Sequence, residues 1–350
     1  MTSDPVRTLV IGASYGLLPA AKIAASGHPV TVVGRSDEIA AIGTDGVGID
    51  FGGERTLRPP MGGQGLRLSV PEAVDVSEHD LVFLAVQEPQ AGAAALADLL
   101  AQIGDRLPVA ALMNMPPPPF LDRLTTLPIT IRAGAYHAAS VWAALSPDRM
   151  TQASPDAQAV RPSAGRPGLL QVTLPSNFKF APFARPADQA LLDRVTRAAS
   201  RVRDAQGILP VQFVTRVSPF TPLAKWPMLA TGNCRCVMPQ GATPRSIAAA
   251  VGDDPAVSRQ IYDAVLAALM ACGAPGPALV PFDSYAVAAR RLAFPSSLAR
   301  ALHVGATQVE RIDLLVLTLL RETGQDAETC DLMNAVSATI GDQLSTGRRA

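Results

Sequence analysis

The sequence is poor in lysine, in cysteine and in net charge. Only Lys22, Lys179 and Lys225 occur among 350 residues, and thirty basic residues are balanced by thirty acidic ones. Because phosphate binding needs a basic surface, we expect no nucleic-acid partner. The four cysteines lack the paired spacing of a metal site, so we expect no metal centre and no disulfide framework.

Long apolar runs are also missing. The most apolar stretch near the C-terminus, residues 314–320, is bracketed by Asp313 and Arg321 and is much shorter than the roughly 20 residues that a bilayer requires. Residues 1–5 lack the basic region of a secretory signal. With 48% hydrophobic and 17% charged residues the chain is typical of a globular protein. We therefore expect a cytoplasmic protein that does not contact membranes.

The first part of the chain alternates short β-branched segments with alanine-rich ones. This pattern predicts a parallel sheet with helices on its faces. The fully apolar segment 81–86 is typical of a strand buried inside such a sheet. We expect a hairpin between 47–51 and 66–70, strands at 8–11, 30–33, 81–86, 109–113 and 169–174, and helices at 17–25, 91–103 and 189–205.

From about Pro219 onward the β pattern disappears. The sequence predicts an α/β protein with a Rossmann-type doubly wound sheet in a dinucleotide-binding domain (1–216), followed by an all-helical substrate and dimerisation domain (217–350). Apolar segments such as 314–320 fit either a homodimer surface or a buried core helix. Helices are predicted at 223–234, 255–272, 284–292, 297–302, 308–321 and 326–343.

The turn after the first predicted strand lies where a dinucleotide-binding domain holds pyrophosphate. The usual fingerprint has glycine at its first, third and sixth positions. Here Ser14 and Leu17 replace the second and third glycines, and Gly16 lies one position early. The position between strand and helix still favours phosphate binding. The candidate cofactor residues are Gly12, Ala13, Ser14, Tyr15 and Gly16.

Arg35 follows the second predicted strand. NAD sites usually place an acid there to hold the ribose hydroxyls, whereas arginine suits the 2′-phosphate of NADP. The other interpretation is a solvated loop residue. We predict NADP in preference to NAD.

Lys225 lies in a run without other charges, from Pro222 to Ala230. A lysine in apolar surroundings has a lowered pKa and can exchange a proton, as a general acid must. A lysine on a half-buried helix more often just extends its ammonium to water. The run by itself does not decide between these roles.

Several segments, taken in order, resemble the ketopantoate reductase family and its wider group of NADP-dependent 2-oxoacid reductases. The resemblance covers most of the chain, although no single motif is specific. It rests on Val33-Gly34-Arg35, Leu112-Met113-Asn114, residues 135–139 with 146–150, Lys225 to Asn233, Pro295-Ser296-Ser297-Leu298 and Val309 to Asp313.

This resemblance implies an NADPH-dependent reduction in which hydride attacks a ketone and Lys225 supplies the proton. It implies that Asn114, Asn233 and Ser297 bind substrate. Without it, Asn233 and Ser297 could be helix-capping residues and Asn114 a turn residue. The further cofactor positions that the resemblance implies are Arg35, Gln87, Asn114 and Glu310.

The sequence also departs from the family pattern. Gln87 stands where a lysine is usual, Leu229 where a second substrate asparagine is expected, and Ala301 where an acid follows the serine pair. Buried polar groups left without partners are unfavourable, so apolar replacements argue against ketopantoate itself. We predict a larger or more apolar oxo or imino substrate.

Two other functions fit the same layout. An opine-dehydrogenase-like enzyme would depend on a histidine, for which His137 is the candidate. A non-catalytic dinucleotide-binding protein would explain the altered glycine pattern and Gln87.

Overall fold

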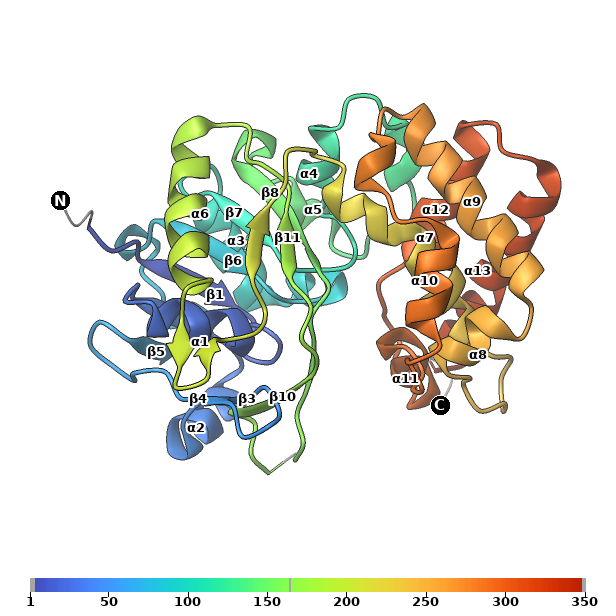
Figure 1. Ribbon diagram of the computed structural model, residues 1–350. Coiled ribbons are helices and arrows are strands. Elements are labelled where there is room, and N and C mark those ends of the chain that lie inside the picture. The colour runs from blue at the N-terminus through green and yellow to red at the C-terminus, as the bar shows by residue number, and fades with distance from the viewer. Residues whose placement is uncertain (1–3, 164, 348–350) are drawn as a thin grey trace. The chain divides into compact units, whose positions relative to one another are not determined.

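The N-terminal part of the chain folds around a mostly parallel sheet (Figure 1). The computed structural model describes residues 4–163 and 165–347. Neighbouring strands run parallel from β5 to β8, whereas β11 and the edge strand β14 run in the opposite direction. The order across the sheet is β5 (Leu66–Ser69), β2 (Val30–Val33), β1 (Thr8–Ile11), β6 (Leu81–Leu84), β7 (Val109–Ala111), β8 (Met150–Pro155), β11 (Phe178–Phe180) and β14 (Phe213–Thr215).

The central strands are buried on both faces. Val10 and Phe83 pack into one core with α1 (Leu17–Ala25) and α6 (Pro186–Ala199). Leu9 points to the opposite face of the sheet and is fully buried as well. Continuous apolar strands are what a doubly covered parallel sheet requires. The predicted Rossmann-type α/β fold is confirmed.

A second, smaller sheet corrects one prediction. Its order is β4 (Thr56–Leu57), β3 (Gly48–Asp50), β10 (Leu169–Leu174) and β9 (Gln158–Val160). The predicted hairpin between 47–51 and 66–70 is therefore wrong. β3 pairs with β4 and β10, whereas β5 extends the main sheet beside β2. Gly48 pairs directly with Leu169, whose side chain lies over the glycine.

Other elements differ from prediction mainly in their ends. The helix predicted at 189–205 begins at Pro186 and stops at Ala199, since a short hairpin of β12 (Arg203–Asp204) and β13 (Gly207–Ile208) follows. The sequence did not predict β8, β11 or β14. The remaining α-helices of this part are α2 (Ser36–Asp45), α3 (Ala94–Ile103), α4 (Pro118–Asp122) and α5 (Ala139–Trp142).

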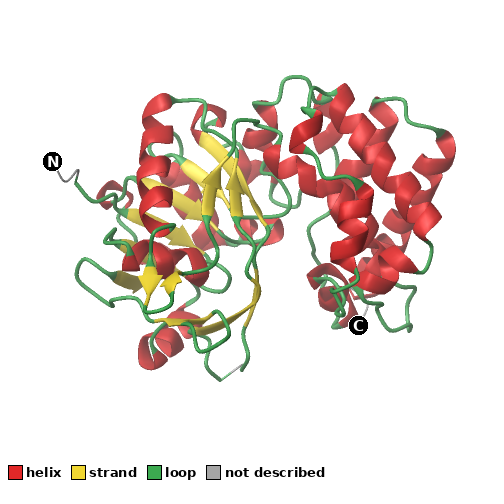
Figure 2. Cartoon of the chain, in the orientation of Figure 1, coloured by secondary structure: helices red, strands yellow, loops and turns green. Residues whose placement is uncertain are grey.

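After β14 the described chain contains only helices and loops (Figure 2). The segment around Lys225 is a succession of short helical types: η6 (Thr221–Lys225), α7 (Trp226–Met228), a π-helical turn η7 (Leu229–Asn233) and η8 (Cys234–Cys236). The longer helices are α8 (Ile247–Gly252), α9 (Pro255–Ala271), α10 (Phe282–Ala289), α11 (Ser297–His303), α12 (Ile312–Glu322) and α13 (Ala327–Gly347).

The chain forms two compact units, and two segments of its N-terminal half belong to the C-terminal unit. Unit 1 comprises residues 1–86, 90–123 and 139–222, and unit 2 comprises 87–89, 124–138 and 223–350. The short helix η4 (Ile129–Arg132) thus belongs with the C-terminal helices and contacts α12. The division after residue 216 stays a prediction about domains. Across residues 4–163 and 165–347, every helix is too short or too polar to cross a membrane.

Candidate functional site

The turn between β1 and α1 is closely packed around its two glycines. Gly12 has φ +115°, and a Cβ there would lie 2.4 Å from the Ala85 carbonyl oxygen. A Cβ on Gly16 would lie 2.2 Å from the Gly12 oxygen and 3.1 Å from the Ala85 Cβ. Gly16 therefore provides the close packing that the fingerprint assigns to its last glycine. The last glycine of the motif lies one residue early, but it still allows the helix to pack closely on the strands.

The residues between these glycines divide into two kinds. Ala13 is buried and Ser14 is exposed, directly before a helix N-terminus that no side chain caps. Tyr15 instead anchors the turn, because its hydroxyl donates to the Ala157 carbonyl at 2.7 Å and its ring packs 5.8 Å from Phe178. Burial raises the pKa of the Tyr15 hydroxyl. Ser14 and the helix start are thus the part of the turn that a phosphate can approach.

The end of β2 lies against this turn. A Cβ on Gly34 would be 2.5 Å from the Ala13 Cβ, so the two backbones touch. Arg35 follows with 77% of its side chain exposed, 3.4 Å from the Asp37 carboxylate. A guanidinium exposed beside a dinucleotide-type turn can contact a phosphate.

Arg161 is a residue of this region that the sequence did not predict. It follows β9, and its guanidinium donates to the Ala13 carbonyl at 2.9 Å and to the Glu38 carboxylate. Its contact with Ala13 spans 148 residues. No local pattern could therefore have identified it.

Asn114 lies at the end of β7, next to a second amide. It is half-buried, and its Oδ1 has no hydrogen-bond donor among the described residues. Gln152 of β8 donates from Nε2 to the Met113 carbonyl at 2.8 Å and so fixes the backbone before Asn114. The Gln152 Oε1 is likewise buried without a donor within 4–163 and 165–347. An unpaired buried acceptor is unfavourable, so this strand end is suited to a ligand that donates hydrogen bonds.

Unit 2 brings several other predicted residues together. Lys225 and Asn233 are both half-buried, at the start and the end of the 225–233 helical segment. The hydroxyl of Ser296 donates to the Asn233 carbonyl at 2.8 Å and accepts from the Ala299 N–H at 3.1 Å. Ser296 is thus the N-cap of α11, while Ser297 is exposed at its first turn. The serine pair therefore lies beside Asn233.

Glu310 and Gln87 also belong to unit 2. The Glu88 N–H donates to Glu310 Oε1 at 3.4 Å, and Glu88 Oε1 accepts from the Ala138 N–H at 2.8 Å. Glu88 is fully buried, whereas Gln87 and His137 on either side of this contact are exposed. The predicted cofactor positions Gln87 and Glu310 therefore lie close together, because Gln87 precedes Glu88 and Glu310 accepts the Glu88 N–H. The sequence did not predict a role for Glu88.

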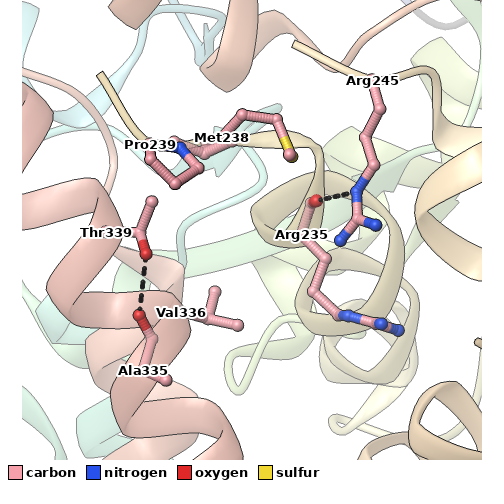
Figure 3. Close-up of a pocket in the computed structure, with 8 residues that line it drawn as sticks. Arg235, Met238, Pro239, Arg245, Ala335, Val336 and Thr339 are labelled. Carbon is pink, nitrogen blue, oxygen red and sulfur yellow. Dashed lines mark hydrogen bonds between the residues drawn. The ribbon is translucent and has the colours of Figure 1, made fainter. Parts of the chain in front are cut away.

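A separate pocket of about 260 Å³ lies elsewhere in unit 2 (Figure 3). The Arg245 Nε donates to the Arg235 carbonyl at 2.8 Å, and the Arg235 guanidinium donates to the Ser258 hydroxyl. Both arginines therefore support the backbone and α9. None of the predicted site residues lines it: the lining is Arg235, Val237, Met238, Pro239, Arg245, Ala335, Val336 and Thr339. Within residues 4–163 and 165–347, no group of His, Cys, Asp or Glu side chains could hold a metal ion.

Comparison with protein families gives a match at the nucleotide end. Residues 8–115 match the family described as ApbA, ketopantoate reductase PanE/ApbA. The predicted resemblance to the ketopantoate reductase family is confirmed. The matched region contains the Gly12 to Gly16 turn, Arg35, Gln87 and Asn114. No curated protein sequence matches the chain.

Ketopantoate reductases also share the fold over nearly the whole chain. The 2-dehydropantoate 2-reductase of Methylococcus capsulatus is 15% identical with TM-score 0.67, covering 97% of this chain and 98% of its own. A PanE/ApbA family ketopantoate reductase from Ralstonia eutropha JMP134 is 18% identical with TM-score 0.63, covering 97% and 99%. A D-mandelate dehydrogenase, in a ternary structure with NADH and anilino(oxo)acetate, is 12% identical with TM-score 0.64, covering 97% and 99%.

Proposed function

We propose that the protein is an NADPH-dependent oxidoreductase that reduces the ketone of a 2-oxoacid, or a related oxo or imino compound, with Lys225 as general acid. The observation that carries the proposal is the ketopantoate reductase match over residues 8–115. The turn within it keeps two glycines that no larger residue could replace without a clash.

The residues around the turn fit a dinucleotide. The Gly12 to Gly16 turn would hold the pyrophosphate, and the exposed Arg35 would contact the 2′-phosphate that distinguishes NADPH from NADH. The bound nicotinamide supplies a hydride. Asn114 would orient the ligand. Its Oδ1 is a buried acceptor that receives no hydrogen bond from the described residues, so a ligand could supply the donor.

Lys225 and Asn233 would act on the substrate. An ammonium group can hold a ketone oxygen and donate a proton to it as negative charge develops. The half-buried Asn233 amide offers hydrogen bonds to a carboxylate or hydroxyl, and the exposed Ser297 offers a hydroxyl close by.

A larger or more apolar substrate than ketopantoate remains our proposal. Leu229, at the position where the family resemblance implies a second asparagine, is only 3% exposed. A polar substrate group there would lose its partner. The anilino(oxo)acetate in the ternary structure of a D-mandelate dehydrogenase of similar fold carries an aromatic ring beside its oxo group.

Turnover of a 2-oxoacid panel with NADPH and NADH tests the proposal. We expect higher kcat/KM with NADPH, and higher kcat/KM for bulky apolar 2-oxoacids than for ketopantoate. Lys225→Met should lower kcat by about 10²- to 10⁴-fold while NADPH affinity stays nearly constant. Lys179→Met is the matched control, because Lys179 pairs with Asp156 at 2.8 Å in unit 1.

Three results would contradict parts of this proposal. Calorimetry that detects neither NADPH nor NADH binding would end the oxidoreductase hypothesis. Binding without any turnover would favour a non-catalytic dinucleotide-binding protein. A larger loss in His137→Ala than in Lys225→Met would favour an opine-dehydrogenase-like reaction.

We also propose a homodimer that acts on a small-molecule substrate and binds neither nucleic acid nor membranes. A Staphylococcus aureus ketopantoate reductase described as dimeric has a similar fold, with 10% identity and TM-score 0.61 over 98% of this chain and all of its own. Sedimentation at micromolar concentration would decide between monomer and dimer.

A further inference from the structure

The helical segment from Lys225 to Asn233 contains one residue more than two regular turns need. Eight α-helical residues turn through about 800°, which would place Asn233 about 80° away from Lys225 around the helix axis. Residues 229–233 form a π-helical turn, in which the Cys234 N–H donates to the Leu229 carbonyl five residues earlier. A π-turn inserts one residue, which reduces the offset to about 20°.

The burial pattern agrees with this shifted register. Lys225, Met228 and Asn233 are half-buried, whereas Gly232 is buried. In a regular helix the residue seven positions after Lys225 would share its face, and that residue is Gly232. In this structure Asn233, one residue later, is the one that is half-buried like Lys225. The π-turn therefore places the Lys225 and Asn233 side chains on one face, roughly two turns apart.

Two hydroxyl groups hold the backbone of this turn. The Tyr285 hydroxyl of α10 donates to the Met228 carbonyl at 3.1 Å, and the Thr231 hydroxyl donates to the Pro227 carbonyl at 2.7 Å. Figure 1 shows α10 alongside α7. Tyr285 is 6% exposed and its ring stacks on Tyr262 at 5.4 Å. Burial and stacking therefore hold the Tyr285 ring in one orientation and so fix the position of its hydroxyl.

Gly232 makes room for that hydroxyl. A Cβ at this position would lie 2.1 Å from the Tyr285 oxygen and 3.1 Å from the Ile247 side chain. Gly232 and Tyr285 therefore fit each other, and the site of contact is the turn where the extra residue is inserted.

We propose that Tyr285 is a positioning residue that keeps the 229–233 segment in its π-helical turn and so aligns Asn233 with Lys225 on one substrate. This inference rests on the proposed function, because Lys225 and Asn233 act together only if the chain reduces a substrate that both contact. Tyr285 acts through the Met228 carbonyl and does not touch the substrate. Without the hydroxyl, the segment can relax toward a regular helix and turn Asn233 away.

Tyr285→Phe tests the inference, with Tyr262→Phe as its matched control. Tyr262 is fully buried and stacked on the same ring, but its hydroxyl donates to the Val280 carbonyl. We expect Tyr285→Phe to raise KM for the oxo substrate about five- to tenfold, as loss of an aligned hydrogen bond would, with unchanged NADPH affinity. Tyr262→Phe should leave both constants within about twofold.

A double-mutant cycle separates positioning from general destabilisation. In an Asn233→Ala background, Tyr285→Phe should have almost no further effect on KM, because its influence passes through Asn233. Thr231→Val, which removes the second hydroxyl from the same turn, should behave like Tyr285→Phe. Should Tyr285→Phe fold poorly, Thr231→Val in the same cycle gives the answer.

The outcomes are distinguishable. Additive effects of Tyr285→Phe and Asn233→Ala, or equal effects of Tyr285→Phe and Tyr262→Phe, would overturn the positioning role while the proposed function stands. A wild-type protein that turns over no oxo or imino compound with either dinucleotide would overturn both.

Discussion

The three lysines of this chain lie in three different environments. Lys22 is fully buried in α1, and its ammonium donates to the carbonyls of Leu209, Pro210 and Val211 at 3.3, 2.6 and 2.7 Å. Burial lowers the pKa of Lys22 to about 7. Lys179 forms an ion pair, and Lys225 is the proposed acid. Rarity in the sequence drew attention to Lys225 but gave no hint of the role of Lys22, whose partners lie nearly 190 residues away.

Lys22→Met should destabilise unit 1 strongly. The substitution leaves three buried carbonyls without their donor, and Val211 is held there with φ +64°, which is strained for a β-branched residue. We expect a loss of about 2–4 kcal/mol in the free energy of unfolding, measured in urea. Lys179→Met, which breaks a more exposed pair, should cost less than about 1 kcal/mol. Equal losses would contradict a structural role for the Lys22 ammonium.

At the scale of elements, apolar strands were predictable and polar ones were not. The β-branched segments that became β1, β2 and β6 carry the period and composition of buried strands. β8 contains Thr151, Gln152 and Ser154, which look like loop residues until their buried hydrogen bonds are known. For that reason the sequence did not predict Gln152, the second of the two amides at the strand end near Asn114. The π-turn was missed because helix register depends on the distant Tyr285.

The β1–α1 turn offers a sharp test of an element. Gly12→Ala combines a left-handed φ with a contact of 2.4 Å to backbone, whereas Gly27→Ala has a similar φ of +90° and nothing within 4 Å. We expect Gly27→Ala to cost about 1–2 kcal/mol of stability and to leave NADPH binding intact. Gly12→Ala should cost more and abolish NADPH binding in calorimetry. Normal dinucleotide binding by folded Gly12→Ala would mean that the turn does not form the cofactor site.

At the scale of the whole molecule, stability should depend on two histidines. Burial lowers the pKa of His28 and of His79 below the usual 6.5. The Val6 N–H donates to His28 Nδ1 at 2.9 Å, so that nitrogen must stay unprotonated. The unfolded chain therefore binds protons at a higher pH than the folded chain does. The contribution of these histidines to the free energy of unfolding is fully present above about pH 6.5. It is lost as the pH falls through their lower pKa values in the folded state.

His28→Asn should make stability less dependent on pH. Asparagine can accept the Val6 hydrogen bond through Oδ1 but does not titrate. We expect the melting temperature of the wild type to fall more between pH 7.5 and pH 5.5 than that of His28→Asn. A fall of the same size in both proteins would show that His28 does not control this dependence.

The assembly of residues 124–138 with the C-terminal unit has a consequence for biosynthesis. Residues 124–138 leave the ribosome well before the helices at 223–350 with which they assemble. Ile131, 2% exposed in the folded protein, belongs to a short helix that contacts α12, and the Thr126 hydroxyl bonds to the Cys272 carbonyl. A nascent chain halted after β14 lacks the helices against which residues 124–138 pack in the folded protein. Until the last helices appear, the newly made chain therefore cannot bury the apolar side chains of this segment as the folded protein does.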